Sequence, residues 1–250
     1  MRRDCSSFLC SSCICSFFYE SESNNLDGNI ATQLGQLTDL TRLDLYQNNL
    51  VGSIPTELGE LSSLRILSLN NNGLTGTIPT QLGSLTNLES LTLNINNLSG
   101  TIATQLGQLT GLTNLFLSTN ELTGSIPTEL GQLGNLEKLY IRRNELTGTI
   151  PTELGNLANL KQFSLSRDSG GTLGLTGTIP TELANLENLE FLVMQNNNFD
   201  NKASDGKAVP EDLCEALFVT TPIVDTFKLS NSAGNNEITS EDECLNATFP

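Results

Sequence analysis

Leucine recurs along the chain with a long, regular period that neither one amphipathic helix nor one strand explains. Units of 24 residues follow one another, except that the sixth spans 157–185 and is five residues longer. A half unit covers 25–36, and a seventh, partial unit runs from 186 to 199. A repeat of this length predicts a solenoid whose coils bury their apolar side chains against one another. The full units begin at Leu37, Leu61, Leu85, Leu109, Leu133 and Leu157.

The first half of each unit contains an L-x-L pair, which has the two-residue period of a short strand with alternate side chains buried. Stacked coils set these strands side by side, so the pattern predicts a parallel sheet. An Asn follows three residues after the second apolar position. We expect its amide to bond backbone groups where the chain leaves the strand. These residues are Asn48, Asn72, Asn96, Asn120, Asn144 and Asn197, and Asp168 takes the place in the sixth unit.

The second half of the unit reads L-x-G-x-I-P and continues with a TELGQL-like stretch. Leu and Ile are expected to point inward from a second extended segment. Proline suits a chain edge where no backbone N–H is needed for a ladder, and Ala31 and Ala103 replace it in two units. The following stretch is too short for a stable isolated helix, so we expect a helical turn.

These motifs resemble the plant-type leucine-rich-repeat family, whose consensus carries the same L-x-G-x-I-P block, over residues 25–199. The resemblance implies an α/β fold, a right-handed solenoid with a concave parallel β-sheet and short helical turns on the convex side. It also implies a non-enzymatic scaffold that binds a protein, peptide or glycan on the concave face. Such scaffolds include ectodomains of leucine-rich-repeat receptor-like proteins and polygalacturonase-inhibitor-like solenoids. Residues 1–24 then form a Cys-rich N-terminal segment, and residues 200–250 an acidic C-terminal cap.

Charge and composition narrow the chemistry. Twelve Lys and Arg against 28 Asp and Glu give a formal net charge of −16, which argues against nucleic acid or an anionic membrane as partner. The chain has no His and shows no nucleotide-binding or nucleophile motif. We therefore expect no enzymatic activity, no cofactor and no metal site. No apolar stretch reaches the roughly 18 residues of a membrane-spanning helix.

The two ends leave alternatives open. Cys5, Cys10, Cys13 and Cys15 lie in a segment that fits a secretory signal, an acylated anchor, a disordered start or a metal site, although their spacing matches no standard zinc pattern. Residues 200–250 hold ten Asp and Glu against three Lys. Cys214 and Cys244 are predicted to form a disulfide in an oxidising compartment.

The expected location is extracellular or at the cell surface. Two glycosylation sequons, at Asn97 and Asn246, favour it weakly. The alternative is a cytoplasmic protein-interaction scaffold, which differs in two testable respects: whether Cys214 and Cys244 are oxidised, and whether residues 1–20 are removed. The sequence leaves the identity of the ligand and the oligomeric state open.

Outward residues of the L-x-L strands are the natural binding candidates, because a curved sheet presents them on one continuous surface. Positive charges gather there beside two aromatic residues, and exposed aromatics next to Arg are typical binding anchors. The alternative is that Glu137, Glu145 and Asp168 neutralise the charges as ordinary surface pairs. The insertion at 169–174 adjoins this surface, either as a binding loop or as a tolerated bulge. The candidates, named here the cationic–aromatic patch, are Phe116, Lys138, Tyr140, Arg142, Arg143, Lys161 and Arg167.

A second candidate surface consists of hydroxyl side chains that flank the Gly of L-x-G-x-I. Stacked coils would set them in a regular grid, as on the ice-binding faces of some antifreeze solenoids. The simpler explanation is that Thr and Ser suit exposed strands, so ice binding is kept as an alternative. This hydroxyl ladder comprises Thr75, Thr77, Ser99, Thr101, Thr123, Ser125, Thr147, Thr149, Thr176 and Thr178.

Overall fold

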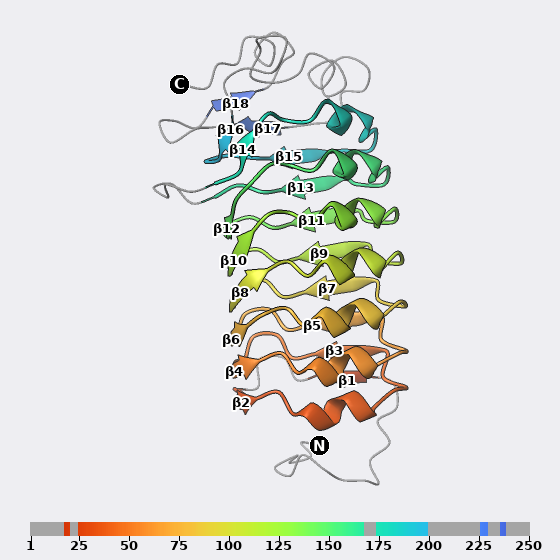
Figure 1. Cartoon of the computed structure of the whole chain (residues 1–250). Helices are drawn as coiled ribbons and strands as arrows, with labels where there is room; N and C mark the ends of the chain where they lie inside the picture. Colours follow the sequence, from red (N-terminus) through yellow and green to blue (C-terminus); the bar gives the residue numbers. More distant parts are fainter. Residues whose placement is uncertain (1–17, 21–24, 168–173, 200–225, 230–235, 239–250) are drawn as a thin grey trace.

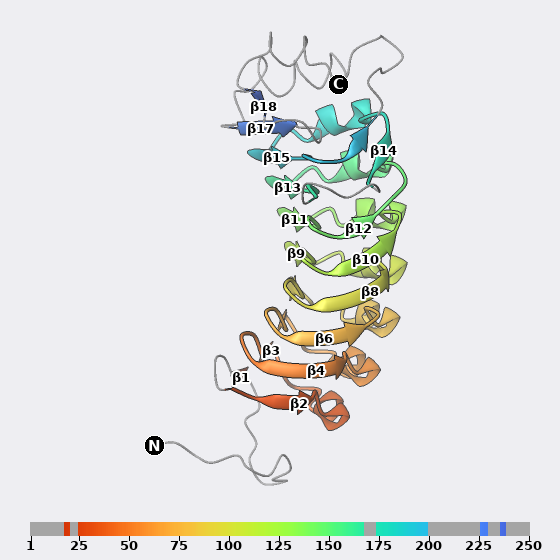
Figure 2. The ribbon, with the colours of Figure 1, turned by 90° about the vertical axis from the view of Figure 1, so that its left-hand side faces the viewer.

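The computed structural model describes residues 18–20, 25–167, 174–199, 226–229 and 236–238. The coils stack in chain order into one elongated solenoid (Figure 1). Viewed from the side, the stack bends into an arc with a long sheet on its inner side and short helices on its outer side (Figure 2). The right-handed winding stays a prediction. The N-terminal cysteines, residues 169–173 of the insertion at 169–174, Cys214, Cys244 and Asn246 lie outside the described residues.

A ten-stranded sheet lines the inner side of the arc, and its neighbouring strands are parallel except for the final antiparallel pair. Between β3 and β13, residues 24 apart lie opposite each other, as Leu43 and Leu67 do. The strands are β1 (Phe18–Glu20), β3 (Arg42–Asp44), β5 (Ile66–Ser68), β7 (Ser90–Thr92), β9 (Asn114–Phe116), β11 (Lys138–Tyr140), β13 (Gln162–Ser164), β15 (Phe191–Val193), β17 (Thr226–Leu229) and β18 (Asn236–Ile238).

The ten-stranded sheet begins earlier than the leucine pattern. Strand β1 pairs with β3 at the same spacing of 24, so that Tyr19 lies opposite Leu43. The sheet therefore starts before residue 25, where the regular leucines start. At the other end, β17 adds to β15, and β18 turns back along β17. The parallel sheet of the solenoid thus continues into both flanking segments.

The L-x-G-x-I segments form a second set of strands on the side of the solenoid (Figure 2). The first six coils give one parallel sheet, and a separate two-stranded sheet follows. The break coincides with the insertion, across which a single bridge joins Gly148 and Leu175. The strands are β2 (Asp27–Asn29), β4 (Asn49–Ser53), β6 (Gly73–Gly76), β8 (Asn97–Thr101), β10 (Glu121–Gly124) and β12 (Glu145–Leu146), then β14 (Thr176–Gly177) and β16 (Asn198–Phe199).

The predicted helical turns are confirmed as five-residue 3-10 helices on the outer side of the arc. Pro55, with φ of −63°, precedes the second one in the extended conformation, and its fixed φ suits this position. Ala103 adopts nearly the same φ, −64°, before the fourth. The helices are η1 (Thr32–Gln36), η2 (Thr56–Glu60), η3 (Thr80–Ser84), η4 (Thr104–Gln108), η5 (Thr128–Gln132), η6 (Thr152–Asn156) and η7 (Thr181–Asn185).

Close stacking of the 3-10 helices explains the Gly in the TELG stretch. A Cβ built on Gly107 would lie 2.4 Å from the backbone oxygen of Glu129 in the next coil, which is far inside van der Waals contact. The glycines of η1 to η6 all make this approach. The same position in η7 holds Ala184, and no further 3-10 helix follows it among the described residues. Ala therefore replaces Gly in the one 3-10 helix of the described residues that has no following helix packed against it.

The asparagine ladder is confirmed. The buried amide of Asn120 donates to the carbonyl oxygens of Leu117, at 3.0 Å, and of Leu93 in the preceding coil, at 3.1 Å. Its Oδ1 accepts a 3.0 Å hydrogen bond from the backbone N–H of Leu98. One side chain thus satisfies three buried backbone groups on two coils, which the strands alone leave unpaired.

A second asparagine ladder, which the sequence reasoning missed, ties the loops after the 3-10 helices. Asn135 Nδ2 donates to the backbone oxygen of Thr110 in the preceding coil at 2.8 Å. Asn87, Asn159 and Asn188 make the corresponding bonds. The signal was available as the recurring N-L pair in the middle of L-x-N-L. This ladder is structural, because it joins consecutive coils on the outer side.

Candidate ligand-binding surface

The centre of the cationic–aromatic patch is a stacked aromatic pair on the ten-stranded sheet. Phe116 ends β9 and Tyr140 ends β11, and the two residues lie directly opposite each other. Their ring centroids are 4.9 Å apart with an angle of 23° between the planes, the offset-stacked arrangement that aromatic rings favour. Both side chains stay partly exposed. The strands therefore hold a rigid apolar surface open to solvent at the middle of the sheet.

Two cations flank the tyrosine on the same face, Lys138 at the start of β11 and Arg142 two residues beyond its end. Lys138, Tyr140 and Arg142 alternate along the chain, so their side chains leave the sheet in one direction. Lys138 is half-buried and Arg142 is exposed. Within the described residues neither makes an ion pair. These two side chains consequently carry the positive charge of the patch that is available to a ligand.

The phenol of Tyr140 is fixed and neutral. It donates a hydrogen bond to Oε1 of Gln162 on the next coil. Burial raises the pKa of Tyr140 above its ordinary value of 10.0, and the nearby Arg142 opposes the shift to a smaller extent. The hydroxyl therefore stays protonated throughout the neutral range. Because its only hydrogen is donated to Gln162, the hydroxyl oxygen can accept a hydrogen bond at the edge of the aromatic surface.

Two of the predicted cations lie apart from this centre. Lys161 precedes β13, and its Nζ forms a 3.0 Å ion pair with Oε2 of Glu137. The guanidinium of Arg167 donates from Nε to the backbone oxygen of Asn144 at 3.3 Å. The alternative of local neutralisation is thus confirmed for Lys161. Glu145 is exposed, and Asp168 lies outside the described part of the chain.

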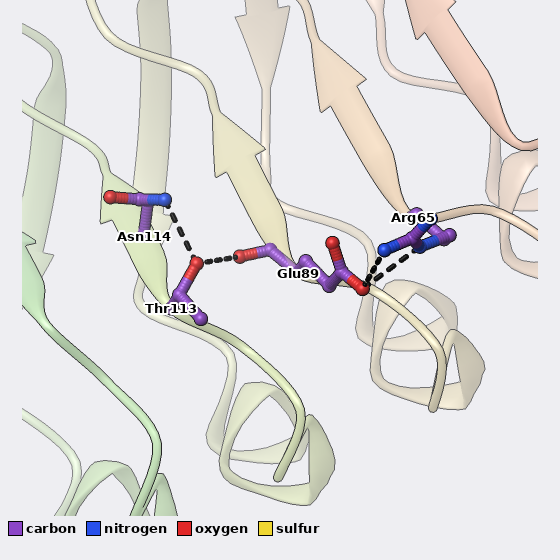
Figure 3. A network of polar contacts seen from close by, with 4 residues as sticks. All are labelled: Arg65, Glu89, Thr113 and Asn114. Carbon is purple, nitrogen blue, oxygen red and sulfur yellow. Dashed lines mark hydrogen bonds and ion pairs between the residues drawn. The ribbon is translucent and has the colours of Figure 1, made fainter.

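Lys161 belongs to a separate column of polar residues at the N-terminal ends of the strands of the ten-stranded sheet. Each residue of this polar column immediately precedes a strand. In this column Arg65 donates from Nε to Oε1 of Glu89 at 2.8 Å, and the backbone oxygen of Glu89 accepts from the hydroxyl of Thr113 at 2.9 Å. Asn114 donates to the same hydroxyl at 2.9 Å. Figure 3 shows this network crossing adjacent coils. Sequence reasoning missed the column, because its residue types change from coil to coil.

Arg143, another member of the patch, has an unusual backbone conformation. Its φ is +55°, and the same left-handed conformation recurs at this position in five other coils. Asn tolerates it, but Ile95, at φ +59°, and Thr119, at φ +58°, are β-branched and therefore strained. The side chain of Ile95 is also 47% exposed. Ile95, at the edge of the patch, is thus an exposed apolar residue in a strained backbone conformation.

One buried hydroxyl beneath the patch lacks a partner. Ser118 is 7% exposed, and its Oγ makes no hydrogen bond. The residue lies one coil before Arg142 at the same position of the unit, two residues after Phe116. An unpaired buried polar atom is costly, so a ligand group that reached it would gain a hydrogen bond. Nothing in the repeat pattern indicates this burial, because Ser is common on exposed strands.

The residues of the hydroxyl ladder lie on the strands of the six-stranded sheet and on β14 or within a few residues of the ends of these strands, and most of them are exposed. Its geometry differs from the expected grid. In this sheet residues 22 apart lie opposite each other, so Thr101 faces Thr123 and Ser99 faces Glu121. Each coil is therefore displaced by two residues relative to its neighbour. Hydroxyl residues at the same position of successive units therefore lie on a diagonal. Directly across the strands, Ser99 lies opposite Glu121 and Thr75 lies opposite Asn97.

Packing supplies a reason for the recurrent hydroxyl residues. Gly124, at φ +75°, needs the conformational freedom of glycine. A Cβ at this position would lie 2.9 Å from the methyl group of Thr101 in the preceding coil. The side chain of the preceding coil thus rests on each glycine. Small β-branched or hydroxyl residues suit that contact, whatever the function of the surface.

The family model for the leucine-rich repeat matches residues 39–61, 63–85, 111–133 and 135–157. The chain is a leucine-rich-repeat protein. Nothing among the curated proteins matches it. Within the described residues no helix is long and apolar enough to cross a membrane, and no group of acidic or Cys side chains is arranged to hold a metal ion.

Solved structures similar to this leucine-rich-repeat chain include plant receptors. The plant peptide hormone receptor RGFR1 in complex with RGF2 shares 39% identity with a TM-score of 0.70 over 76% of this chain and 29% of the receptor. The ectodomain of the Arabidopsis thaliana receptor kinase GASSHO1/SCHENGEN3, in complex with CASPARIAN STRIP INTEGRITY FACTOR 2, shares 34% identity with a TM-score of 0.70 over 83% and 26%. The Arabidopsis HAESA ectodomain, with an IDA peptide hormone, shares 31% with a TM-score of 0.69 over 85% and 33%. The chain spans a third or less of these receptors.

Proposed function

We propose that this chain is a recognition module of an extracellular or cell-surface protein, and that it binds an acidic segment of a protein or peptide on the ten-stranded sheet. The observation that carries the proposal is the stacked pair of Phe116 and Tyr140 between Lys138 and Arg142. Rigid aromatic side chains beside Arg are the residues that dominate binding energy at interfaces. The similar structures named above include a plant peptide hormone receptor in complex with RGF2 and the HAESA ectodomain in complex with a peptide hormone, which supports the class of ligand.

Charge also favours an acidic ligand at this position. A protein with a net charge of −16 repels acidic partners over most of its surface, so the two unpaired cations offer them one favourable contact area. The aromatic pair would cover apolar parts of the ligand, and the neutral phenol of Tyr140 would bond a backbone group. Ser118 and Arg142 together suit a carboxylate oxygen, because one donates a neutral and the other a charge-assisted hydrogen bond.

A panel of synthetic peptides with rising numbers of Asp and Glu residues, each with or without an aromatic residue, tests the proposal by fluorescence anisotropy. Wild type should bind acidic aromatic peptides most tightly, and affinity should fall as salt rises. The double variant K138Q/R142Q should bind at least about tenfold more weakly, equal to about 1.4 kcal/mol. Arg65→Gln, which removes a paired cation outside the patch, is the matched control. Equal affinity of all three proteins, or preference for a sulfated oligosaccharide of the same charge, would contradict the proposal.

The oxidation state of Cys214 and Cys244 distinguishes the proposed extracellular location from the intracellular alternative. In the proposed compartment Cys214 and Cys244 form a disulfide, and mapping of the peptides from the natural source should find it. Free thiols on both residues would favour the cytoplasmic scaffold instead. The ice-binding alternative predicts thermal hysteresis in solutions of the pure chain, and it is disfavoured because the rows directly across the sheet mix hydroxyls with Asn97 or Glu121.

A further inference from the structure

The six-stranded sheet presents an Asn whose surroundings differ from those of the buried ladder asparagines. Ladder residues such as Asn96 and Asn120 are buried and use their amides on backbone groups. Asn97 begins β8 and is exposed. Among the described residues its side-chain amide makes no hydrogen bond. It is followed by the buried Leu98 and by Ser99, which completes an Asn-x-Ser sequon.

We propose that Asn97 is an N-glycosylation site, and that its glycan covers the six-stranded sheet. Strand alternation places Asn97 and Ser99 on the same outer face, with Leu98 pointing to the core. Because β8 lies in the middle of the sheet order, between β6 and β10, a sugar on Asn97 extends over both neighbours. Thr75 lies directly opposite Asn97. The inference rests on the proposed extracellular location, since the modification belongs to secreted proteins.

The reaction is a transfer from a polyprenyl-diphosphate-linked oligosaccharide, catalysed by the transferase of the secretory pathway. The amide nitrogen of Asn97 forms a bond to the anomeric carbon of the first sugar. The bond from this carbon to the diphosphate oxygen breaks, the lipid diphosphate leaves, and the amide loses one proton. The product keeps one amide N–H. It leaves the backbone hydrogen bonds of β8 unchanged, since only the exposed side chain reacts.

A glycan at this position has a consequence for the two candidate surfaces. It shields the central hydroxyls, including Thr75 and Ser99, from a flat partner or an ice surface. The ten-stranded sheet lies on another side of the solenoid (Figure 2) and stays accessible. The modification therefore restricts ligand binding to the sheet that carries Phe116 and Tyr140.

The test uses the full chain secreted from eukaryotic cells, once with its own N-terminus and once behind a heterologous signal peptide. Glycosidase treatment and peptide mass spectrometry then report occupancy. With the heterologous signal, Asn97 should carry a glycan, and Asn97→Gln and Ser99→Ala should each lose the corresponding gel shift. Asn49→Gln, at the equivalent position without a sequon, should leave the shift unchanged.

A gain-of-site variant strengthens the test. Val51→Ser places a hydroxyl residue two positions after the exposed Asn49, in the same strand geometry two coils earlier, so this chain should gain one further glycan. An unmodified Asn97 in the secreted chain would overturn the inference, most clearly where Asn246 of the same molecules is occupied. If the chain is secreted and glycosylated behind the heterologous signal but is not secreted with its own N-terminus, the result contradicts the proposed extracellular location. It would still show that Asn97 can accept a glycan.

Discussion

Tyr140 donates its phenolic hydrogen to Gln162 on one neighbouring coil while its ring stacks on Phe116 of the other. Three consecutive coils are thereby joined by one exposed side chain, which fixes the orientation of the ring. A binding surface gains from such fixation, because less conformational freedom is lost when a ligand docks. The relationship explains why an aromatic residue in the middle of the sheet can serve both stability and recognition.

Alkaline pH should weaken the fold through Tyr140. Burial raises the pKa of this phenol in the folded chain above its ordinary value, so folding favours the protonated form. The contribution is complete below about pH 10, the unfolded value, and is lost as pH rises through the folded pKa. Urea unfolding of wild type and Tyr140→Phe should therefore show a difference in pH dependence above about pH 10. Parallel curves for the two proteins would mean that the environment of the phenol does not perturb its titration.

The asparagine ladder should carry a large share of the stability of the solenoid. Asn120→Ala removes three bonds and leaves the buried N–H of Leu98 unpaired, while the oxygens of Leu93 and Leu117 keep only their bonds from Asn96 and Asn144. The expected loss in unfolding free energy is about 3 kcal/mol, measured by urea denaturation. Asn94→Ala, at a partly exposed position, is the control and should change stability by less than about 0.5 kcal/mol. Equal effects of both substitutions would show that the ladder bonds contribute no net stability.

Left-handed backbone strain at Ile95 predicts a stabilising substitution. Asn adopts positive φ more readily than a β-branched residue, and the exposed side chain of Ile95 loses little burial when it is replaced. Ile95→Asn should raise the unfolding free energy by about 1 kcal/mol. Thr92→Asn, in the regular strand β7, should give no such gain. A lower melting temperature of Ile95→Asn would contradict the strain argument, whereas a loss of ligand binding in a more stable protein would identify Ile95 as a contact residue.

The stacking of the 3-10 helices gives a paired prediction. Gly107→Ala adds a methyl group where only 2.4 Å is available, so it should destabilise the chain by about 1–3 kcal/mol. The reverse change at the last helix, Ala184→Gly, removes a methyl group and should cost only about 0.5–1 kcal/mol through backbone entropy. Calorimetric melting of both variants measures the difference. If Gly107→Ala melted at the wild-type temperature, the close approach of η4 and η5 would not be rigid.

Much of the fold follows from the sequence, because the constraints repeat. The ladder role of Asn120 and the strand around Leu115 are readable from spacing, since each coil meets an identical neighbour. The displacement of the second sheet is not readable, because pairing at 22 instead of 24 depends on how the strands incline to the stacking direction. For that reason the predicted hydroxyl grid is wrong in its geometry, although the residues themselves are exposed as expected.

The candidate site was only partly predictable for a different reason. Phe116 and Tyr140 occupy the same position in adjacent coils, so their proximity follows from the repeat. The pairing of Lys161 with Glu137 depends on side-chain conformation at the edge of the sheet, which no periodic pattern encodes. The burial of Ser118 is likewise not encoded in the repeat, because Arg142 at the same position of the next coil is exposed. The sequence thus identifies the surface, and the structure identifies which of its charges are unpaired.

Quantitative affinity capture from extracellular extract of the source material tests whether the cationic–aromatic patch binds the natural ligand. The full chain, the patch variant Y140A/R142Q and the control Arg65→Gln are immobilised at equal density, and bound proteins and peptides are measured by mass spectrometry. We expect the ligands captured by wild type to be captured equally by the control and at least about tenfold less by the patch variant. Equal capture of the same ligands by all three proteins would contradict it.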